Sequence, residues 1–147
     1  ASDVYKRQVE ILGGVHAIGT PPTRATTAKD VFKAALFEAT ASLGAGTTAY
    51  STSGEVSGAG YSAGGITVTN ATAPTSSGTT AYWTPSASLT YSGVTLTTAF
   101  DAVLIYNSTQ GDKAVAVYTF GSQTVTSGDF ILTMPTNDSS TALLRIA

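Results

Sequence analysis

The chain has 147 residues, enough for one domain with a substantial core. Only 11% of them are charged, against roughly 25% in an average soluble domain, and the formal net charge is −2. The seven Lys and Arg residues are scattered, which disfavours nucleic-acid binding, and the absence of cysteine excludes disulfides, thiolate catalysis and cysteine-based metal sites. So few charges favour a surface covered by copies of the chain or by a partner; a monomer solubilised by its hydroxyl groups is the alternative.

The first part of the chain reads as an arm that precedes the folded domain. Its opening letters, "ASDVYKRQ" (residues 1–8), resemble translated adapter sequence left by gene assembly, and we interpret them as a sequencing artefact. The rest of residues 1–29 has no strand alternation and contains Pro21-Pro22. We therefore predict a loose N-terminal arm over residues 1–29 and a single domain over residues 30–147.

From Asp30 onward, short apolar segments alternate with turn residues, which is typical of an all-β domain. The continuous apolar runs Val103–Ile105 and Ala114–Val117 predict central strands covered on both faces. Together the segments predict a two-sheet β-sandwich or jelly-roll-like domain of about eight strands. The expected strands are Val31–Phe37, Ile66–Thr72, Thr79–Thr84, Leu89–Thr98 with a bulge or a close approach at Gly93, Asp101–Tyr106, Lys113–Phe120, Asp129–Met134 and Ala142–Ala147.

Two connections are candidates for contacts with other subunits. The first, "GEVSGAGYSAGG" (Gly54–Gly65), lacks the following helix and the Lys of a phosphate-binding loop, so it predicts a long β-connection whose glycines supply positive φ angles. The second, Asn107–Asp112, has the Asn, Gly and Asp of a hairpin tip. The residues expected at an interface are Gly58, Gly60, Tyr61, Asn107 and Asp112.

No catalytic, cofactor-binding or metal-binding residue is predicted. The only histidine, His16, lies in the arm, which leaves no base for a Ser-His-Asp triad. The domain's acids are far apart in the sequence; a fold-assembled carboxylate pair of a small hydrolase, or a calcium site at Asn107 and Asp112, stays an alternative. These acids are Glu38, Glu55, Asp101, Asp112, Asp129 and Asp138.

The aromatic residues Trp83 and Tyr82 suggest a second kind of site. Exposed on a β-sandwich, such rings would form a platform that stacks against sugars. The alternative, which we favour, is that Trp83 fills the core and the tyrosines border an interface.

Several segments, in matching order and spacing, resemble a family of small structural proteins of tailed bacteriophages. They include "FKAALF", "TTAYSTSGEVSGAGYSAGG", "LIYNST", "KAVAVYTFG", "SGDFILTMP" and "LLRIA", and the resemblance covers about Asp30 to Ala147. It implies an all-β, non-enzymatic protein located in the virion. Before Asp30 the sequence departs from the family, which tends to begin with a short helical lead-in.

The resemblance and the composition together give one expected function and one alternative. The expected function is that of a capsid decoration (cement) protein, which stabilises the phage head by contacts between subunits. Its partners would be copies of itself, for example in a trimer, and the major capsid or another virion protein, with no nucleic acid, membrane or cofactor. The alternative is a carbohydrate- or receptor-binding β-module of a tail fibre, or a neck or tail component.

Overall fold

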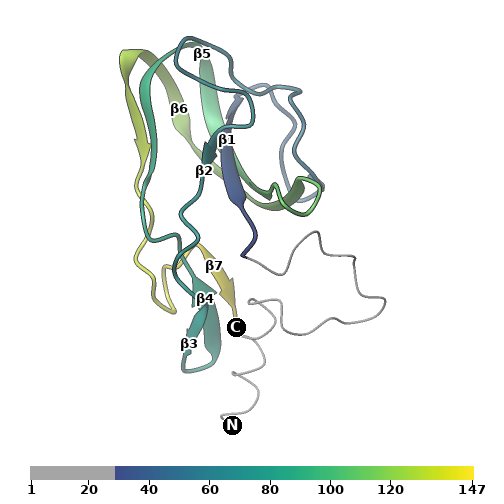
Figure 1. Cartoon of the computed structure of the whole chain (residues 1–147), viewed down its shortest axis with the longest axis vertical. Helices are drawn as coiled ribbons and strands as arrows, with labels where there is room; N and C mark the ends of the chain where they lie inside the picture. Colours follow the sequence, from purple (N-terminus) through teal and green to yellow (C-terminus); the bar gives the residue numbers. More distant parts are fainter. Residues whose placement is uncertain (1–28) are drawn as a thin grey trace. The chain divides into compact units, whose positions relative to one another are not determined.

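The computed structural model describes residues 29–147, which form an all-β structure of seven strands in two antiparallel sheets (Figure 1). This confirms the predicted fold class. The described residues contain no helix, and therefore none that is long and apolar enough to cross a membrane. The predicted arm lies outside the described residues except for Lys29.

The chain divides into two compact units, and the described part of the larger one comprises residues 29–68 and 89–132. Its sheet has the strand order β2-β1-β5-β6, in which each neighbouring pair is antiparallel. The strands are β1 (Phe32–Glu38), β2 (Ile66–Thr67), β5 (Leu89–Asn107) and β6 (Lys113–Leu132). The prediction of one domain over residues 30–147 stays a prediction.

The core of this unit lies where β1 pairs with the second half of β5. The register places Ala35 opposite Leu104 and Phe37 opposite Ala102, and all four side chains are buried. Burial along β1 is continuous from Ala34 to Phe37, and the run Val103–Ile105 in β5 is also buried. Consecutive side chains point to opposite faces, so burial of all of Val103–Ile105 shows that both faces are covered. β5 also lies between β1 and β6, so the prediction of a central strand is confirmed for Val103–Ile105.

In two places, two strands that we predicted as separate form one long strand. The segments Leu89–Thr98 and Asp101–Tyr106 are joined in β5, and Lys113–Phe120 and Asp129–Met134 are joined in β6, which ends at Leu132. The two long strands stay paired through several register shifts, which let the ladder bend without a turn. One shift lies between Tyr91 and Val94, where Gly93 has a φ of +62°, so the predicted irregularity at Gly93 is confirmed.

The prediction of a central strand at Ala114–Val117 is wrong. β5 lies between β1 and β6 in the sheet. β6 is therefore the last strand, and it has a neighbouring strand, β5, on one side only. Val115 consequently keeps 37% of its surface exposed. The apolar run Ala114–Val117 therefore predicts a strand correctly but does not predict whether that strand is central or at the edge of the sheet.

The described part of the smaller unit comprises residues 69–88 and 133–147. Its three-stranded sheet has the order β3-β4-β7, formed by β3 (Thr75–Ser77), β4 (Thr80–Trp83) and β7 (Leu144–Ile146). β4 lies in the centre and pairs antiparallel with both neighbours. β3 was not predicted, because "TSS" has no apolar residue to signal a strand.

Candidate functional site

The glycine-rich connection Gly54–Gly65 lies against two strands of the larger sheet. Near its start, the amide of Glu38 in β1 donates to the carbonyl of Gly54 (2.8 Å), and Val56 donates back to Leu36 (3.0 Å). Further along, the amide of Thr95 in β5 donates to the carbonyl of Ala59 (2.8 Å). The connection leads into β2 and contains no helix, as predicted.

The close approach of two backbone segments explains why glycine is needed at Gly58 and Gly60. A Cβ built on Gly58 would lie 2.0 Å from the carbonyl oxygen of Thr95, and one on Gly60 would lie 2.5 Å from that of Gly93. Gly60 also has a φ of +78°, which confirms a positive φ angle at this position. A Cβ on either of these predicted contact residues would thus meet strand β5 of the same chain.

The carboxylate of Glu55 gathers three hydrogen-bond donors at the centre of the connection. The hydroxyl of Tyr50 donates to its Oε2 (2.6 Å), the hydroxyl of Tyr61 to its Oε1 (2.7 Å), and the amide of Gly64 to Oε1 (2.8 Å). Tyr61 in turn accepts a hydrogen bond from the backbone amide of Leu36 (3.0 Å). Glu55 and its donors, here called the Glu55 clamp, therefore tie the connection to β1.

Two further tyrosines extend the clamp into the core. The ring of Tyr50 stacks on that of Tyr106 with centroids 4.6 Å apart, and Tyr61 lies over Tyr91 at 6.0 Å. Tyr106 donates its hydroxyl to the carbonyl of Gly64 (2.8 Å), and Tyr91 donates to that of Ala34 (2.8 Å). Each of these four hydroxyls thus donates to an acceptor within the larger unit.

The surroundings keep these tyrosines protonated. Burial, followed by the hydrogen bond to Glu55, raises the pKa of Tyr50 and of Tyr61 far above the ordinary 10.0. Burial also raises the pKa of Tyr91 far above that value and the pKa of Tyr106 to about 12. A protonated tyrosine donates to a carboxylate but accepts no proton from a substrate, so the arrangement suits a structural role.

We had not predicted the Glu55 clamp, although the sequence carries a signal for it. Glu55 is the only charged residue between Glu38 and Asp101. A lone carboxylate among hydroxyl-rich and apolar residues is expected to find partners, because an unpaired buried charge is costly. The sequence does not show that these partners are Tyr50, five positions earlier, and Tyr61, six positions later.

Replacing Glu55 by Ala is expected to lower the free energy of unfolding by roughly 2–3 kcal/mol, because two hydroxyls and one amide lose their acceptor. Glu55→Gln keeps one carbonyl oxygen and should lose about half as much. Urea unfolding followed by circular dichroism measures both. Equal stability of Glu55→Ala and the unchanged chain would contradict a stabilising clamp.

Alkaline pH is expected to unfold the larger unit. In the unfolded chain the tyrosines ionise near pH 10, whereas the folded chain holds the pKa of Tyr106 at about 12 and those of Tyr50, Tyr61 and Tyr91 higher still. Stability is therefore fully present below pH 10 and falls as the pH rises above it, because the unfolded state binds fewer protons. Urea unfolding followed by circular dichroism at pH 8 and at pH 11 measures the effect; equal free energies of unfolding at the two pH values would contradict this.

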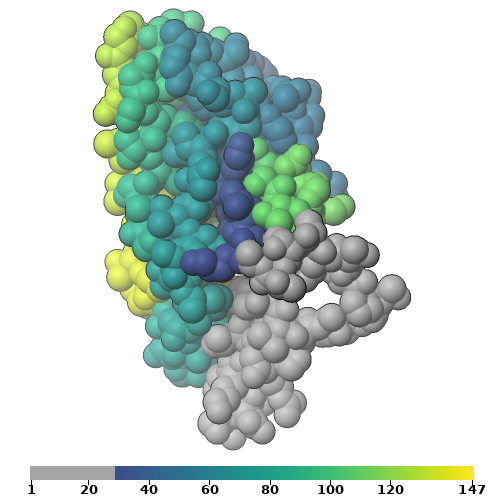
Figure 2. Space-filling model, in the orientation of Figure 1, coloured from purple at the N-terminus to yellow at the C-terminus, as the bar shows by residue number. Residues whose placement is uncertain are grey.

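The hairpin tip Asn107–Asp112 joins β5 to β6, as predicted, and Figure 2 shows this green segment at the surface. The Oδ1 of Asn107 accepts from the amides of Thr109 (3.1 Å) and Gln110 (3.2 Å), and its Nδ2 donates to Asp30 (2.8 Å). Asp112 is exposed with a φ of +56°, and its carbonyl accepts from Tyr50 (2.8 Å). The tip thus contacts Asp30 and Tyr50, whereas the glycine-rich connection contacts β1 and β5, a difference that the sequence alone did not show.

Trp83 and Tyr82 lie on β4 in the smaller unit. Trp83 is 6% exposed, and its Nε1–H donates to the carbonyl of Thr72 (2.8 Å). Tyr82 is half-buried, and adjacent residues of a strand point to opposite faces of the sheet. The two rings therefore do not form one flat platform.

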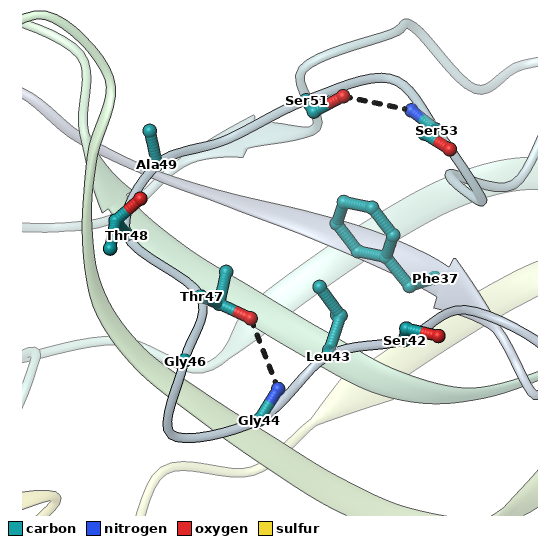
Figure 3. Close-up of a pocket in the computed structure, with 10 residues that line it drawn as sticks. All are labelled: Phe37, Ser42, Leu43, Gly44, Gly46, Thr47, Thr48, Ala49, Ser51 and Ser53. Carbon is teal, nitrogen blue, oxygen red and sulfur yellow. Dashed lines mark hydrogen bonds between the residues drawn. The ribbon is translucent and has the colours of Figure 1, made fainter.

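A cavity of about 650 Å³ lies beside the segment 42–53 (Figure 3). Its lining contains Phe37, Leu43 and five Ser or Thr side chains, but no charged residue. Two of these hydroxyls accept local backbone hydrogen bonds: Thr47 from Gly44 (3.0 Å) and Ser51 from Ser53 (3.2 Å). The lining offers no general acid or base.

Two further acids of the described residues, Asp129 in β6 and Asp138 in a loop, accept hydrogen bonds from backbone amides. Asp129 accepts from the amide of Gly93 (2.8 Å), and Asp138 accepts from Ser140 (2.7 Å) and Thr141 (2.8 Å). These backbone amides hold the pKa of Asp138 below its usual value. Over residues 29–147 no group of three or more His, Cys, Asp or Glu side chains is placed to hold a metal ion.

Comparison with protein-family models, with curated proteins and with solved structures found no match to this chain.

Proposed function

We propose that the protein is a non-enzymatic structural component of a tailed-bacteriophage virion, foremost a capsid decoration protein. It would act by burying its surface against neighbouring subunits and so reinforce the head. The bacteriophage origin rests on the sequence resemblance described above. The observation that carries the structural role is an all-β body with a charge content of only 11%.

The chemistry of the described residues supports this role. The carboxylate of Glu55 is occupied by two tyrosines and one backbone amide. The cavity beside residues 42–53 has hydroxyl and apolar side chains but no titratable group. Such features suit a protein that is repeated on a particle and keeps a fixed shape.

The surface available for contacts is weakly charged and rich in hydroxyls. Of the twenty residues of β6 only Lys113 and Asp129 carry charge, and most of its Thr and Ser side chains are exposed. Burying hydroxyl groups against a partner costs less free energy than burying charged groups, because less favourable hydration is lost. The hairpin tip at Asn107–Asp112 is our first choice for a contact segment, since Gly111 and Asp112 are exposed and Asn107 accepts hydrogen bonds from two amides of the turn.

Co-sedimentation of the full chain with capsids tests the proposal. The capsids are assembled from the major capsid protein encoded in the same genome, and tails from that genome serve as a second target. We expect saturable binding to capsids at a stoichiometry set by capsid symmetry, with a higher temperature of capsid disruption. Binding to tails alone would assign the protein to the neck or tail, and binding to neither would overturn the proposal.

A further inference from the structure

The loop formed by residues 39–54 is held at both ends and in its middle. Its ends meet on β1, where the amide of Glu38 donates to the carbonyl of Gly54 (2.8 Å). Its middle lies against the start of β6, where the amide of Ala114 donates to the carbonyl of Thr48 (3.0 Å). These hydrogen bonds fix the backbone of the loop relative to the larger sheet.

The side chains of this loop are too small to fill the space that its backbone surrounds. Its sequence, "ATASLGAGTTAYSTSG", contains only two large residues, Leu43 and Tyr50. Tyr50 belongs to the Glu55 clamp and stacks on Tyr106 with centroids 4.6 Å apart, so it fills the core instead. Leu43 is left as the one large side chain of the loop at the cavity of about 650 Å³ beside residues 42–53.

The cavity combines hydroxyl groups with apolar surface. Figure 3 shows Phe37 and Leu43 in the middle of the site, with the Ser and Thr side chains around them. The hydroxyls of Thr47 and Ser51 each accept one backbone hydrogen bond and keep their own hydrogen for donation. Three other hydroxyls of the lining make no hydrogen bond with residues 29–147: those of Ser42, Thr48 and Ser53.

We propose that this cavity binds a neutral polyhydroxy ligand, namely a monosaccharide or a disaccharide. A charged ligand would lose hydration and meet no opposite charge among the described residues of the lining. A wholly apolar ligand would cover the hydroxyls without giving them hydrogen-bond partners. A sugar avoids both costs, because its hydroxyls donate and accept hydrogen bonds while its C–H groups contact apolar side chains. The volume of about 650 Å³ also lies within the range of roughly 300–1,000 Å³ that is usual for ligand sites.

This site differs from the aromatic platform that the sequence suggested at Trp83 and Tyr82. The described residues of its lining all belong to the larger unit, whereas Trp83 and Tyr82 belong to the smaller one. The site does not rest on the proposed function either. A chain that binds sugar but neither capsids nor tails would refute the proposed function alone, and a chain that binds capsids but no sugar would refute this site alone.

Two-dimensional amide NMR spectra of the full chain, titrated with sugars, test the proposal. The probes are glucose, galactose and lactose, and the charged counterparts at pH 6 are glucuronate, galacturonate, glucosamine and galactosamine. At least one neutral sugar should give saturable shifts at millimolar concentrations, centred on Gly44, Gly46 and the adjacent amides of residues 42–53. The charged counterparts should bind about tenfold more weakly or less, because the lining offers them no opposite charge.

The variant S42A/T48V/S53A tests the hydroxyls directly. It removes three hydroxyls that make no hydrogen bond with residues 29–147, so the fold should persist while the dissociation constant for the sugar rises about tenfold or more. The matched control is S92A/S122A/T124V, which makes the same kinds of change at exposed positions of β5 and β6. This control should bind sugar like the unchanged chain.

The same spectra establish that both variants are folded. The absence of shifts with all three neutral sugars, or shifts confined to residues outside 37–53, would overturn the proposal. Equal affinity for a neutral sugar and its charged counterparts would overturn the ligand class. Unchanged affinity of S42A/T48V/S53A would show that these hydroxyls do not bind the sugar.

Discussion

Replacing Gly65 by Ala is expected to destabilise the larger unit by roughly 4–5 kcal/mol or more, or to prevent its folding. A Cβ at this position would lie 1.8 Å from the carbonyl oxygen of Ala34 and 2.7 Å from the Cα of Ala35, both in β1. These are backbone atoms of a buried strand, so they move only if the β1–β2 pairing moves. The φ of +69° adds strain for any residue other than glycine.

Gly121→Ala provides the matched control. A Cβ on Gly121 meets nothing within 4 Å, and this glycine does not have a positive φ. Ala should therefore be neutral or slightly stabilising there, because it reduces the conformational freedom of the unfolded chain. Urea unfolding of both variants at the same pH gives the comparison, and similar stability of Gly65→Ala and Gly121→Ala would show that the connection does not approach β1 closely.

Replacing Trp83 by Ala is expected to cost roughly 3–5 kcal/mol, the range for removing a large buried aromatic side chain. The indole is 6% exposed, and its truncation also leaves the carbonyl of Thr72 without this donor. Trp83→Phe should lose less, since most of the apolar area remains. Thermal unfolding followed by near-ultraviolet circular dichroism measures these losses.

Trp83→Ala also distinguishes the expected function as a decoration protein from the alternative of a carbohydrate-binding module. If Trp83 contacted sugar, Trp83→Ala would abolish glycan binding while the fold kept its stability, and added polysaccharide would shift the Trp83 fluorescence. A buried Trp83 predicts the reverse: loss of stability and no fluorescence response. A stable, non-binding Trp83→Ala variant of a glycan-binding chain would favour the tail-fibre alternative. Tyr82→Ala is the control, because it changes the neighbouring aromatic residue on the opposite face of β4.

Local patterns were sufficient to predict the fold class. Alternation in "LTYSGVTLTT", and apolar runs bounded by turn residues, identify strands because side chains alternate along a strand. The strand predicted over Ile66–Thr72 from "ITVTN" is too long, since β2 ends at Thr67. Asn, Gly and Asp between Asn107 and Asp112 predict a hairpin tip for a similarly local reason. The ends of the long strands were harder to predict, because β5 and β6 continue through residues that would form a turn if they had no partner strand.

The sequence by itself determined that this protein is an all-β chain with few charges, a glycine-rich connection and a hairpin between its two most apolar segments. The tertiary structure decided which strands are central, why the glycines are needed and where Glu55 finds its partners. Those features depend on contacts between distant segments, such as Gly65 with Ala34 and Tyr91 with Ala34. Burial of Ala34–Phe37 and exposure of Val115 arise from strand order, which composition and periodicity do not encode.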